Sequence, residues 1–205
     1  TLTRCEITES PKWLQDKLNT IGLRPINKIV DITNYVMMAY GQPLHCFDAD
    51  MIKGGKIVVK TLPEGTSFVT LDGEERKLSD RDLAVCNAEE PMCIAGVLGG
   101  KGSGTYDTTR DILFESAYFH PTWVRKSARR HGLNTDASFR FERGIDPDGQ
   151  LYALKQAALL AKELAGGEIA MEIVDVQSPE RKKHFEVELE YKYVHELIGK
   201  EITHD

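Results

Sequence analysis

Hydrophobic positions recur at helical spacing near both ends of the chain. In residues 12–21 they form one stripe, which consists of Trp13, Leu14, Leu18 and Ile21. Ser10 is placed to cap this helix, Pro11 to occupy its first position and Gly22 to end it. The same signals predict helices at about 27–40, 121–131 and 149–164, and the start of another at 193–198.

The middle of the chain shows short β-rich segments separated by turn residues. The predicted strands are 56–60, 68–71, 74–78, 83–86, 92–98 and 111–114, the last one followed by Glu115. Asp72-Gly73 is typical of a hairpin turn. Further strands are expected at 169–176 and 185–190, with the charged run 180–183 as a linker. Helical flanks around a strand-rich middle indicate an α+β fold.

Composition is that of an ordinary globular protein. The 205 residues have 41% hydrophobic and 28% charged side chains and a net charge of −6. A net negative charge argues against a surface that as a whole binds nucleic acid by neutralising phosphates. A local basic face remains possible at Arg125, Lys126, Arg129 and Arg130. No apolar run approaches the ~20 residues of a membrane helix. The four cysteines lack CxxC spacing, so reduced thiols in a cytoplasmic protein are expected, without a zinc site.

Several polar residues stand in unusual local settings. Thr33-Asn34 interrupts an apolar helix, where both residues compete for backbone hydrogen bonds, so they face either solvent or a polar cavity. His45 lies between apolar neighbours, which is typical of a hydrogen-bonded core histidine. Glu115 directly follows an apolar strand, where a buried carboxylate is costly unless something binds it. The glycine-rich run 99–104 lacks the order of a phosphate-binding loop.

The segment 132–147 admits two interpretations. The structural one is a short strand at 138–142, with its arginines and acids forming surface pairs. The functional one is the rim of a pocket, in which Thr135, Asp136 and the small Ala137 face a ligand. The spacing alone does not separate these alternatives.

Six ordered blocks together carry a resemblance to a known family. These blocks are Arg24–Asn27, Val30–Val36, Gly41–His45, Ile94–Val97, Glu115–Ala117 and Gly132–Pro147. They resemble the tRNA-editing domain in the beta subunit of bacterial phenylalanyl-tRNA synthetases. The resemblance covers residues 1–178, and residues 179–205 are similar to a linker and the truncated start of the following module. Cys46 stands where this family is expected to have alanine.

The resemblance implies a fold, an activity and partners. The fold is a layered α+β domain with an unusual β-sandwich flanked by helices. The activity is hydrolysis of tyrosine wrongly esterified to phenylalanine tRNA, carried out within an aminoacyl-tRNA ligase but separate from aminoacylation. The partners are that mischarged tRNA and an alpha subunit in an alpha2-beta2 assembly. The fragment itself needs no cofactor, whereas ATP and magnesium belong to the parent enzyme.

The resemblance also assigns site residues, which come from five separate segments of the chain. The catalytic residues are His45, Thr33 and Asn34; the substrate-binding residues are Glu115, Gly96, Gly99, Thr135 and Ala137. No nucleophile elbow is present, so we expect a water molecule to attack the ester without a covalent intermediate. Two rival hypotheses are a non-catalytic module that docks tRNA or holds subunits together, and a free-standing tRNA deacylase.

Overall fold

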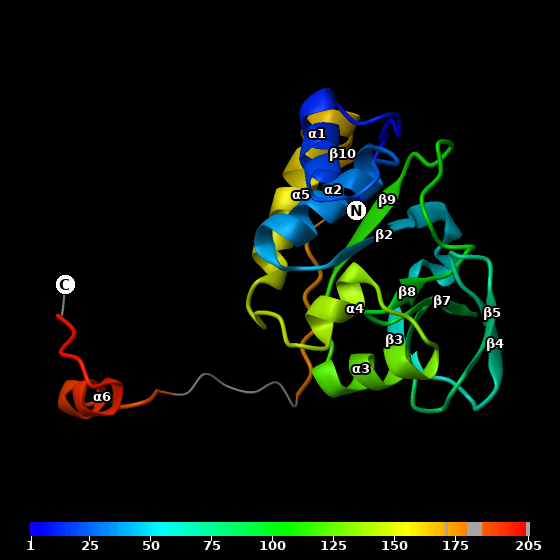
Figure 1. Cartoon of the computed structure of the whole chain (residues 1–205). Coiled ribbons are helices and arrows are strands. Elements are labelled where there is room, and N and C mark those ends of the chain that lie inside the picture. Colours follow the sequence, from blue (N-terminus) through cyan, green and yellow to red (C-terminus); the bar gives the residue numbers. More distant parts are fainter. Residues whose placement is uncertain (171, 180–185, 204–205) are drawn as a thin grey trace. The chain divides into compact units, whose positions relative to one another are not determined.

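A four-stranded antiparallel sheet organises the first part of the chain (Figure 1). Its strand order is β10-β1-β9-β2, formed by Glu168–Ile169, Leu2–Thr3, Ile112–Ser116 and Leu44–Asp48. The computed structural model describes residues 1–170, 172–179 and 186–203. They fall into two units, Thr1–Glu172 and Ile173–Asp205, so the chain divides six residues before the boundary expected at 178.

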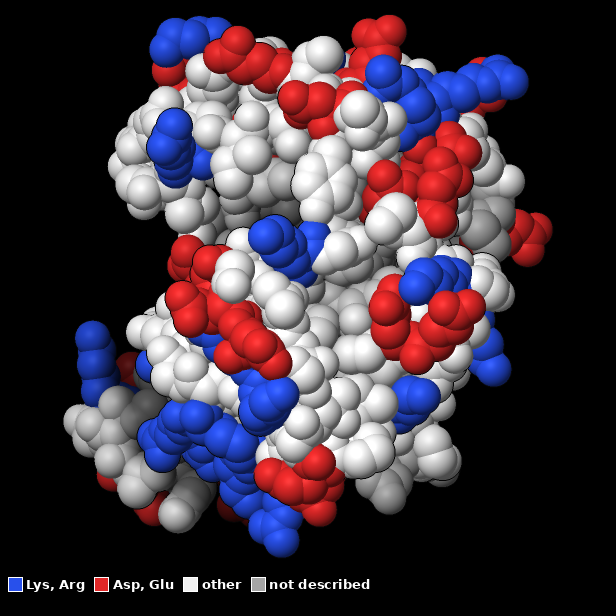
Figure 2. Space-filling view, turned by 90° about the vertical axis from the view of Figure 1, so that its right-hand side faces the viewer, with Lys and Arg blue, Asp and Glu red and all other residues white. Residues whose placement is uncertain are grey.

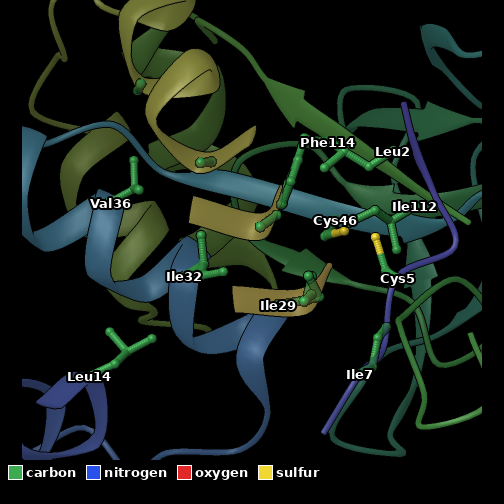
Figure 3. Packing of buried hydrophobic residues seen from close by; sticks show 14 of the residues in the cluster. Leu2, Cys5, Ile7, Leu14, Ile29, Ile32, Val36, Cys46, Ile112 and Phe114 are labelled. Atoms are coloured by element: carbon green, nitrogen blue, oxygen red, sulfur yellow. The ribbon is translucent and has the colours of Figure 1, made fainter. Parts of the chain in front are cut away.

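Three helices cover one face of this sheet. They are α1 (Lys12–Thr20), α2 (Lys28–Tyr40) and α5 (Gln150–Ala165). Every fourth residue of α5 from Ala153 to Ala165 is buried, so small side chains let α5 lie close to α2 and β9. Figure 3 shows the resulting core, in which Ile29, Ile32 and Val36 of α2 meet Cys46 and Phe114 of the sheet.

A second core lies against the opposite face of the same sheet. It combines Phe47 and Leu113 of the first sheet with residues of a second sheet, including Val85 and Ile94. The second sheet has the order β3-β6-β7-β8 and comprises Val58–Thr61, Leu83–Cys86, Pro91–Ile94 and Leu98–Gly99. Two sheets therefore contribute to one core, which confirms the α+β class.

The remaining elements of the first unit surround this second core. They are the 3-10 turns η1 (Ala49–Met51) and η2 (Lys53–Gly55), the hairpin β4 (Thr66–Val69) and β5 (Glu75–Leu78), and the helices α3 (Pro121–Arg130) and α4 (Asp136–Phe141). The second unit contains helix α6, Tyr191–Ile198, which ends at Gly199 with φ 75°. No helix of the described residues is long and apolar enough to cross a bilayer.

The structure corrects the prediction of a strand at 138–142, because this segment lies in helix α4. Thr135 caps the helix by accepting a hydrogen bond from the Ser138 amide, and the Ser138 hydroxyl accepts one from the Thr135 amide. Residues two apart in a helix lie on nearly opposite sides. Phe141 is accordingly buried, whereas Phe139 is exposed.

Other boundaries also differ from the prediction. Ser10 does not cap α1, because its hydroxyl donates a 2.6 Å hydrogen bond to the carboxylate of Asp31. Trp13 and Ile21 are exposed, so only Leu14 and Leu18 of the expected stripe are buried. The strand expected at 92–98 is divided into β7 and β8 by a tight turn, and β9 extends through Glu115 to Ser116.

Towards the end of the chain the predicted strands are mostly absent. Only Glu168–Ile169 of the strand expected near 169–176 is formed, and residues 172–176 and 186–190 are not strands. Residues 171 and 185 and the expected charged linker 180–183 lie outside the described residues. The four cysteines are free and buried.

Candidate functional site

His45 and Glu115 are cross-strand partners at the centre of the candidate site. His45 of β2 pairs with Glu115 of β9, and the neighbouring pair is Cys46 with Phe114. Because directly opposed residues of an antiparallel pair project from the same face, His45 and Glu115 lie together on one face. Cys46 and Phe114 belong to the helix-covered core, so His45 and Glu115 face the second core.

Both side chains have a polar atom that is buried without a partner. The His45 Nε2 and Glu115 Oε2 atoms are shielded from solvent, and neither forms a hydrogen bond with any described residue. Leaving such a group unpaired costs about 1–3 kcal/mol, so a stable fold retains few of them. These two atoms make His45 and Glu115 candidates for contact with a ligand.

Burial moves the pKa values of both side chains away from their ordinary values. It lowers the pKa of His45 to about 4, because the imidazolium form is disfavoured in a poorly solvated position. It raises the pKa of Glu115 to about 7, because the carboxylate form is disfavoured in the same way. At neutral pH His45 is therefore uncharged, and the Glu115 carboxyl exchanges readily between donor and acceptor forms.

The backbone of Gly99 holds the imidazole of His45 in place. A Cβ atom at Gly99 would lie 2.9 Å from His45 Cε1 and 3.4 Å from Nε2, so only glycine permits this approach. On the other side, the Phe47 ring meets the imidazole edge-on, with 4.5 Å between ring centroids. Cys93, which pairs with Gly99 across β7 and β8, has a thiol whose pKa is raised by burial and by the nearby Glu115 charge.

Gly96 lies in a different environment from Gly99. It has φ 69° in the turn between β7 and β8, and a Cβ there would contact Phe141, Phe119 and Val124 at 3.0–3.1 Å. Its surroundings are apolar side chains of the second core. The structure thus places Gly99, and not Gly96, against His45.

Thr135 and Ala137 belong to helix α4 and have separate roles. The Thr135 hydroxyl donates to the carbonyl oxygen of Val97 at 2.8 Å and accepts from the Ser138 amide at 3.0 Å. Thr135 therefore caps α4 and ties it to the turn between β7 and β8. Ala137 is half-buried and packs against the second core, on the side of the sheet that carries His45.

Thr33 and Asn34 lie on helix α2. The Thr33 hydroxyl donates to the carbonyl oxygen of Val30 at 2.7 Å within the helix, so its hydrogen is already used. Asn34 is half-buried, and its amide forms no hydrogen bond with any described residue. Of the two, Asn34 has the free donor and acceptor groups that a ligand requires.

Arg140 connects the helices that carry these residues, and the sequence analysis missed it. Its guanidinium donates to the carbonyl oxygen of Asp136 at 2.9 Å and contacts the sulfur of Met38 on α2. Met38 follows Asn34 by one helical turn, and Arg140 follows Ala137 by almost one turn. The contact therefore brings the Ala137 side of α4 towards the Asn34 side of α2. A helical interpretation of this segment would have placed Arg140 beside Ala137, but the segment was interpreted as a strand.

A separate surface hollow of about 280 Å³ lies elsewhere on the first unit. Its lining includes Met51, Phe68, Asn87, Met92 and Lys101, and none of the eight predicted site residues contributes to it. Within the described part of the chain, no three His, Cys, Asp or Glu side chains are grouped to hold a metal ion.

Comparisons with known proteins identify the family of the chain. A family model described as the B3/4 domain matches residues 2–166. The chain is 66% identical over 196 residues to the phenylalanine–tRNA ligase beta subunit of Bacteroides fragilis and 67% identical over 196 residues to that of Bacteroides thetaiotaomicron. It is 54% identical over 197 residues to that of Porphyromonas gingivalis.

These matches cover 96% of this chain and 24% of each relative, so the chain spans about a quarter of the length of the curated relatives it matches. They confirm the resemblance to the beta subunit of phenylalanyl-tRNA synthetases. The chain belongs to the B3/4 domain family.

Proposed function

We propose that this domain hydrolyses the ester of tyrosine wrongly attached to phenylalanine tRNA. The observation that carries the proposal is the pair of unpartnered buried atoms, His45 Nε2 and Glu115 Oε2, on one face of the β2–β9 pair. His45 Nε2 is suited to a hydrogen bond with a water molecule or the ester, and Glu115 Oε2 to a hydrogen bond with a phenolic hydroxyl. A tyrosyl ester offers both groups, because its phenolic hydroxyl lies at the tip of the side chain and its ester lies at the other end of the amino acid.

Glu115 supplies the selectivity in this proposal. A phenol donates a hydrogen bond to the ionised carboxylate, or accepts one from the protonated carboxyl, and the Glu115 pKa of about 7 makes both forms accessible. Phenylalanine offers neither group, so its binding would leave the carboxyl oxygen unpaired. A site that hydrogen-bonds the hydroxyl therefore discriminates far better than an apolar pocket, which separates such isosteres only by about a hundredfold.

His45 orients the reacting water. Its Nε2 accepts a hydrogen from water, whose oxygen attacks the carbonyl carbon of the ester. The bond from that carbon to the ribose oxygen breaks, and the ribose oxygen gains a proton, which releases tyrosine and free tRNA. Since a histidine with a pKa of about 4 is a weak base, positioning of the water supplies most of the rate. In this proposal Asn34, whose side-chain amide is free of described partners, holds the ester or the amino group.

The walls of the site come from two directions. Gly99 and Phe47 fix the imidazole, while Ala137 leaves room for the aromatic ring of the substrate. Thr33 and Thr135 shape the site by holding their helices, and Gly96 allows the close packing behind α4. The proposal requires no cofactor at this domain. ATP, magnesium, the alpha subunit and a cytoplasmic setting belong to the proposed parent ligase.

The rival function is a module that only docks tRNA or joins subunits. It gives no reason for leaving His45 Nε2 and Glu115 Oε2 unpaired. Binding of free amino acids separates the two functions. Calorimetric titration and a structure of the chain with tyrosine should place the phenol at Glu115 and the carboxyl end near His45. Equal binding of tyrosine and phenylalanine, or binding of neither, would contradict the proposal.

A further inference from the structure

The segment 120–144 is strongly basic in an otherwise acidic chain. It contains six Arg or Lys residues and two Asp or Glu residues, giving a net charge of +4, whereas the whole chain has −6. Figure 2 shows acidic and basic side chains interspersed over most of one face of the molecule, with a group of basic side chains at its lower left. Helices α3 and α4 occupy most of the basic segment and pack against each other.

Most of the cations of α3 lie on its solvent side and pair with no described acid. Val124, Ser127 and Ala128 bury one side of the helix. Arg125, Lys126 and Arg129 are exposed on the other and form no ion pair with any described residue. Arg130 differs, because it binds the buried carboxylate of Asp82. A solvated polar face explains exposed cations, but it does not explain the aromatic residues among them.

Two aromatic side chains are exposed on these helices. Trp123 has 42% of its surface exposed and makes no ring contact with a described residue, whereas the exposed Trp13 packs against Tyr35. On α4, Phe139 is 46% exposed, and the guanidinium of Arg143 lies 3.6 Å above its ring. Single exposed rings are common on protein surfaces, but these two lie on helices that also carry exposed cations, and rings beside cations can stack on the bases of a nucleic acid.

Helix α4 separates this outer surface from the candidate site. Ala137 packs towards the second core, whereas Phe139 of the same helix is exposed, and the guanidinium of Arg143, which follows the helix, lies above the Phe139 ring. An α-helix is about 10–12 Å across with its side chains. A flexible strand on the outside would therefore need only about two nucleotides to bring its end around α4.

We propose that the outer surface of α3 and α4 binds the single-stranded 3′ end of the RNA that carries the ester. We call it the α3–α4 face, and it is defined by Trp123, Arg125, Lys126, Arg129, Phe139 and Arg143. Cations neutralise the phosphates, and the exposed rings stack on unpaired bases, a combination typical of single-strand recognition. An acidic protein surface would satisfy the cations but not the rings. The inference rests on the proposed function.

The test uses the 205-residue chain and a fluorescein-labelled 12-nucleotide single-stranded RNA in fluorescence anisotropy. With one compact basic group on a negative chain, we expect weak binding, at about 10⁻⁴ to 10⁻⁵ M, that falls steeply with salt. Arg125→Gln/Lys126→Gln/Arg129→Gln should weaken binding at least tenfold and reduce the salt slope by about 2, because each single-strand phosphate contact contributes about 0.7. Trp123→Ala should weaken binding about tenfold with an unchanged salt slope.

The matched control is Lys17→Gln/Lys155→Gln/Lys162→Gln, which removes the same charge from exposed positions on α1 and α5. Circular dichroism and thermal melting verify that each variant is folded. Equal loss in both triple variants, no loss in either, or tight salt-insensitive binding would overturn the inference. Hydrolysis of Tyr-tRNA, assayed separately, distinguishes the two proposals: activity without RNA binding on this face contradicts only the inference, and binding without activity contradicts only the proposed function.

Discussion

Glu115 lies directly opposite His45 in the antiparallel pairing of β9 with β2, and each has a buried polar atom that forms no hydrogen bond with a described residue. This pair joins residues 70 positions apart in the sequence. The burial of the Glu115 carboxyl in this pair is the basis of the first prediction.

Replacing Glu115 with glutamine should change how stability depends on pH. Glu115 has a folded pKa of about 7 against an ordinary value of 4.5, so the folded state holds its proton more tightly than the unfolded state. The stabilisation is complete below about pH 4.5 and is lost as pH rises through 7. Relative to the native chain, Glu115→Gln should therefore gain about 2–3 kcal/mol in unfolding free energy between pH 4.5 and 8. Urea unfolding across this pH range measures the difference in unfolding free energy between the two chains. A difference that does not change with pH would contradict a raised pKa for the buried Glu115 carboxyl.

Gly99→Ala should displace the imidazole of His45. The added Cβ would meet His45 Cε1 and Leu71 Cδ1 at 2.9 Å, so one of these side chains must move. Overpacking of this kind costs about 1–3 kcal/mol. Gly102→Ala is the control, because a Cβ there meets nothing within 4 Å and its backbone φ is not positive. The check is thermal unfolding together with the NMR shifts of the His45 ring; identical behaviour of the two variants would argue against the close approach.

Ala137→Trp should fill the space proposed for the substrate ring. Ala137 is half-buried at the second core, and an indole there would occupy the wall nearest the site. We expect hydrolysis of Tyr-tRNA to fall to background while the circular dichroism spectrum is retained. Ala170→Trp, at an exposed position, should keep full activity. Undiminished hydrolysis by Ala137→Trp would remove Ala137 from the site.

Asp82→Ala should destabilise the chain more than loss of a surface acid. The buried carboxylate accepts hydrogen bonds from Ser127 at 2.6 Å and from His131 at 2.7 Å, and it pairs with Arg130. Although burial opposes ionisation, these bonds hold the pKa of Asp82 below its usual value. Removing one partner of a buried pair costs about 3–5 kcal/mol.

The comparison variant for Asp82 is Asp16→Ala, whose exposed pair with Lys12 is worth about 0.3–0.5 kcal/mol. Unfolding free energies at pH 7 measure both effects. Equal small losses would show that the Asp82 cluster does not anchor α3.

Helix ends with strong local signals were predictable from the sequence. Asn27 caps α2 through hydrogen bonds from the Ile29 and Val30 amides, and Gly41 ends it in the left-handed conformation. The strand β6 has the predicted bounds, Leu83–Cys86. In each case the residues that set the boundary are neighbours in the chain, so the information is local.

The arrangement of the site could not be obtained in this way. The register that opposes His45 and Glu115 depends on pairing two distant strands, for which no local signal exists. One interpretation of residues 138–142 was a strand, because Phe139 and Phe141 alternate, and the other placed the capping residue Thr135 on a pocket rim. The resemblance named the site residues, but only the structure separates the groups left free, His45, Asn34 and Glu115, from Thr135, whose hydroxyl is engaged.

The most direct measurement compares hydrolysis of Tyr-tRNA and Phe-tRNA by the parent enzyme with and without Glu115→Ala, in a variant shown to be folded. A lost hydrogen bond to a charged group is worth about 1.5–3 kcal/mol, so the preference for Tyr-tRNA should fall about ten- to a hundredfold and mischarging with tyrosine should rise. Aminoacylation with phenylalanine should remain unchanged. An equal loss of hydrolysis on both substrates, or full retention on both, would contradict the assignment of Glu115 as the group that recognises the tyrosine hydroxyl.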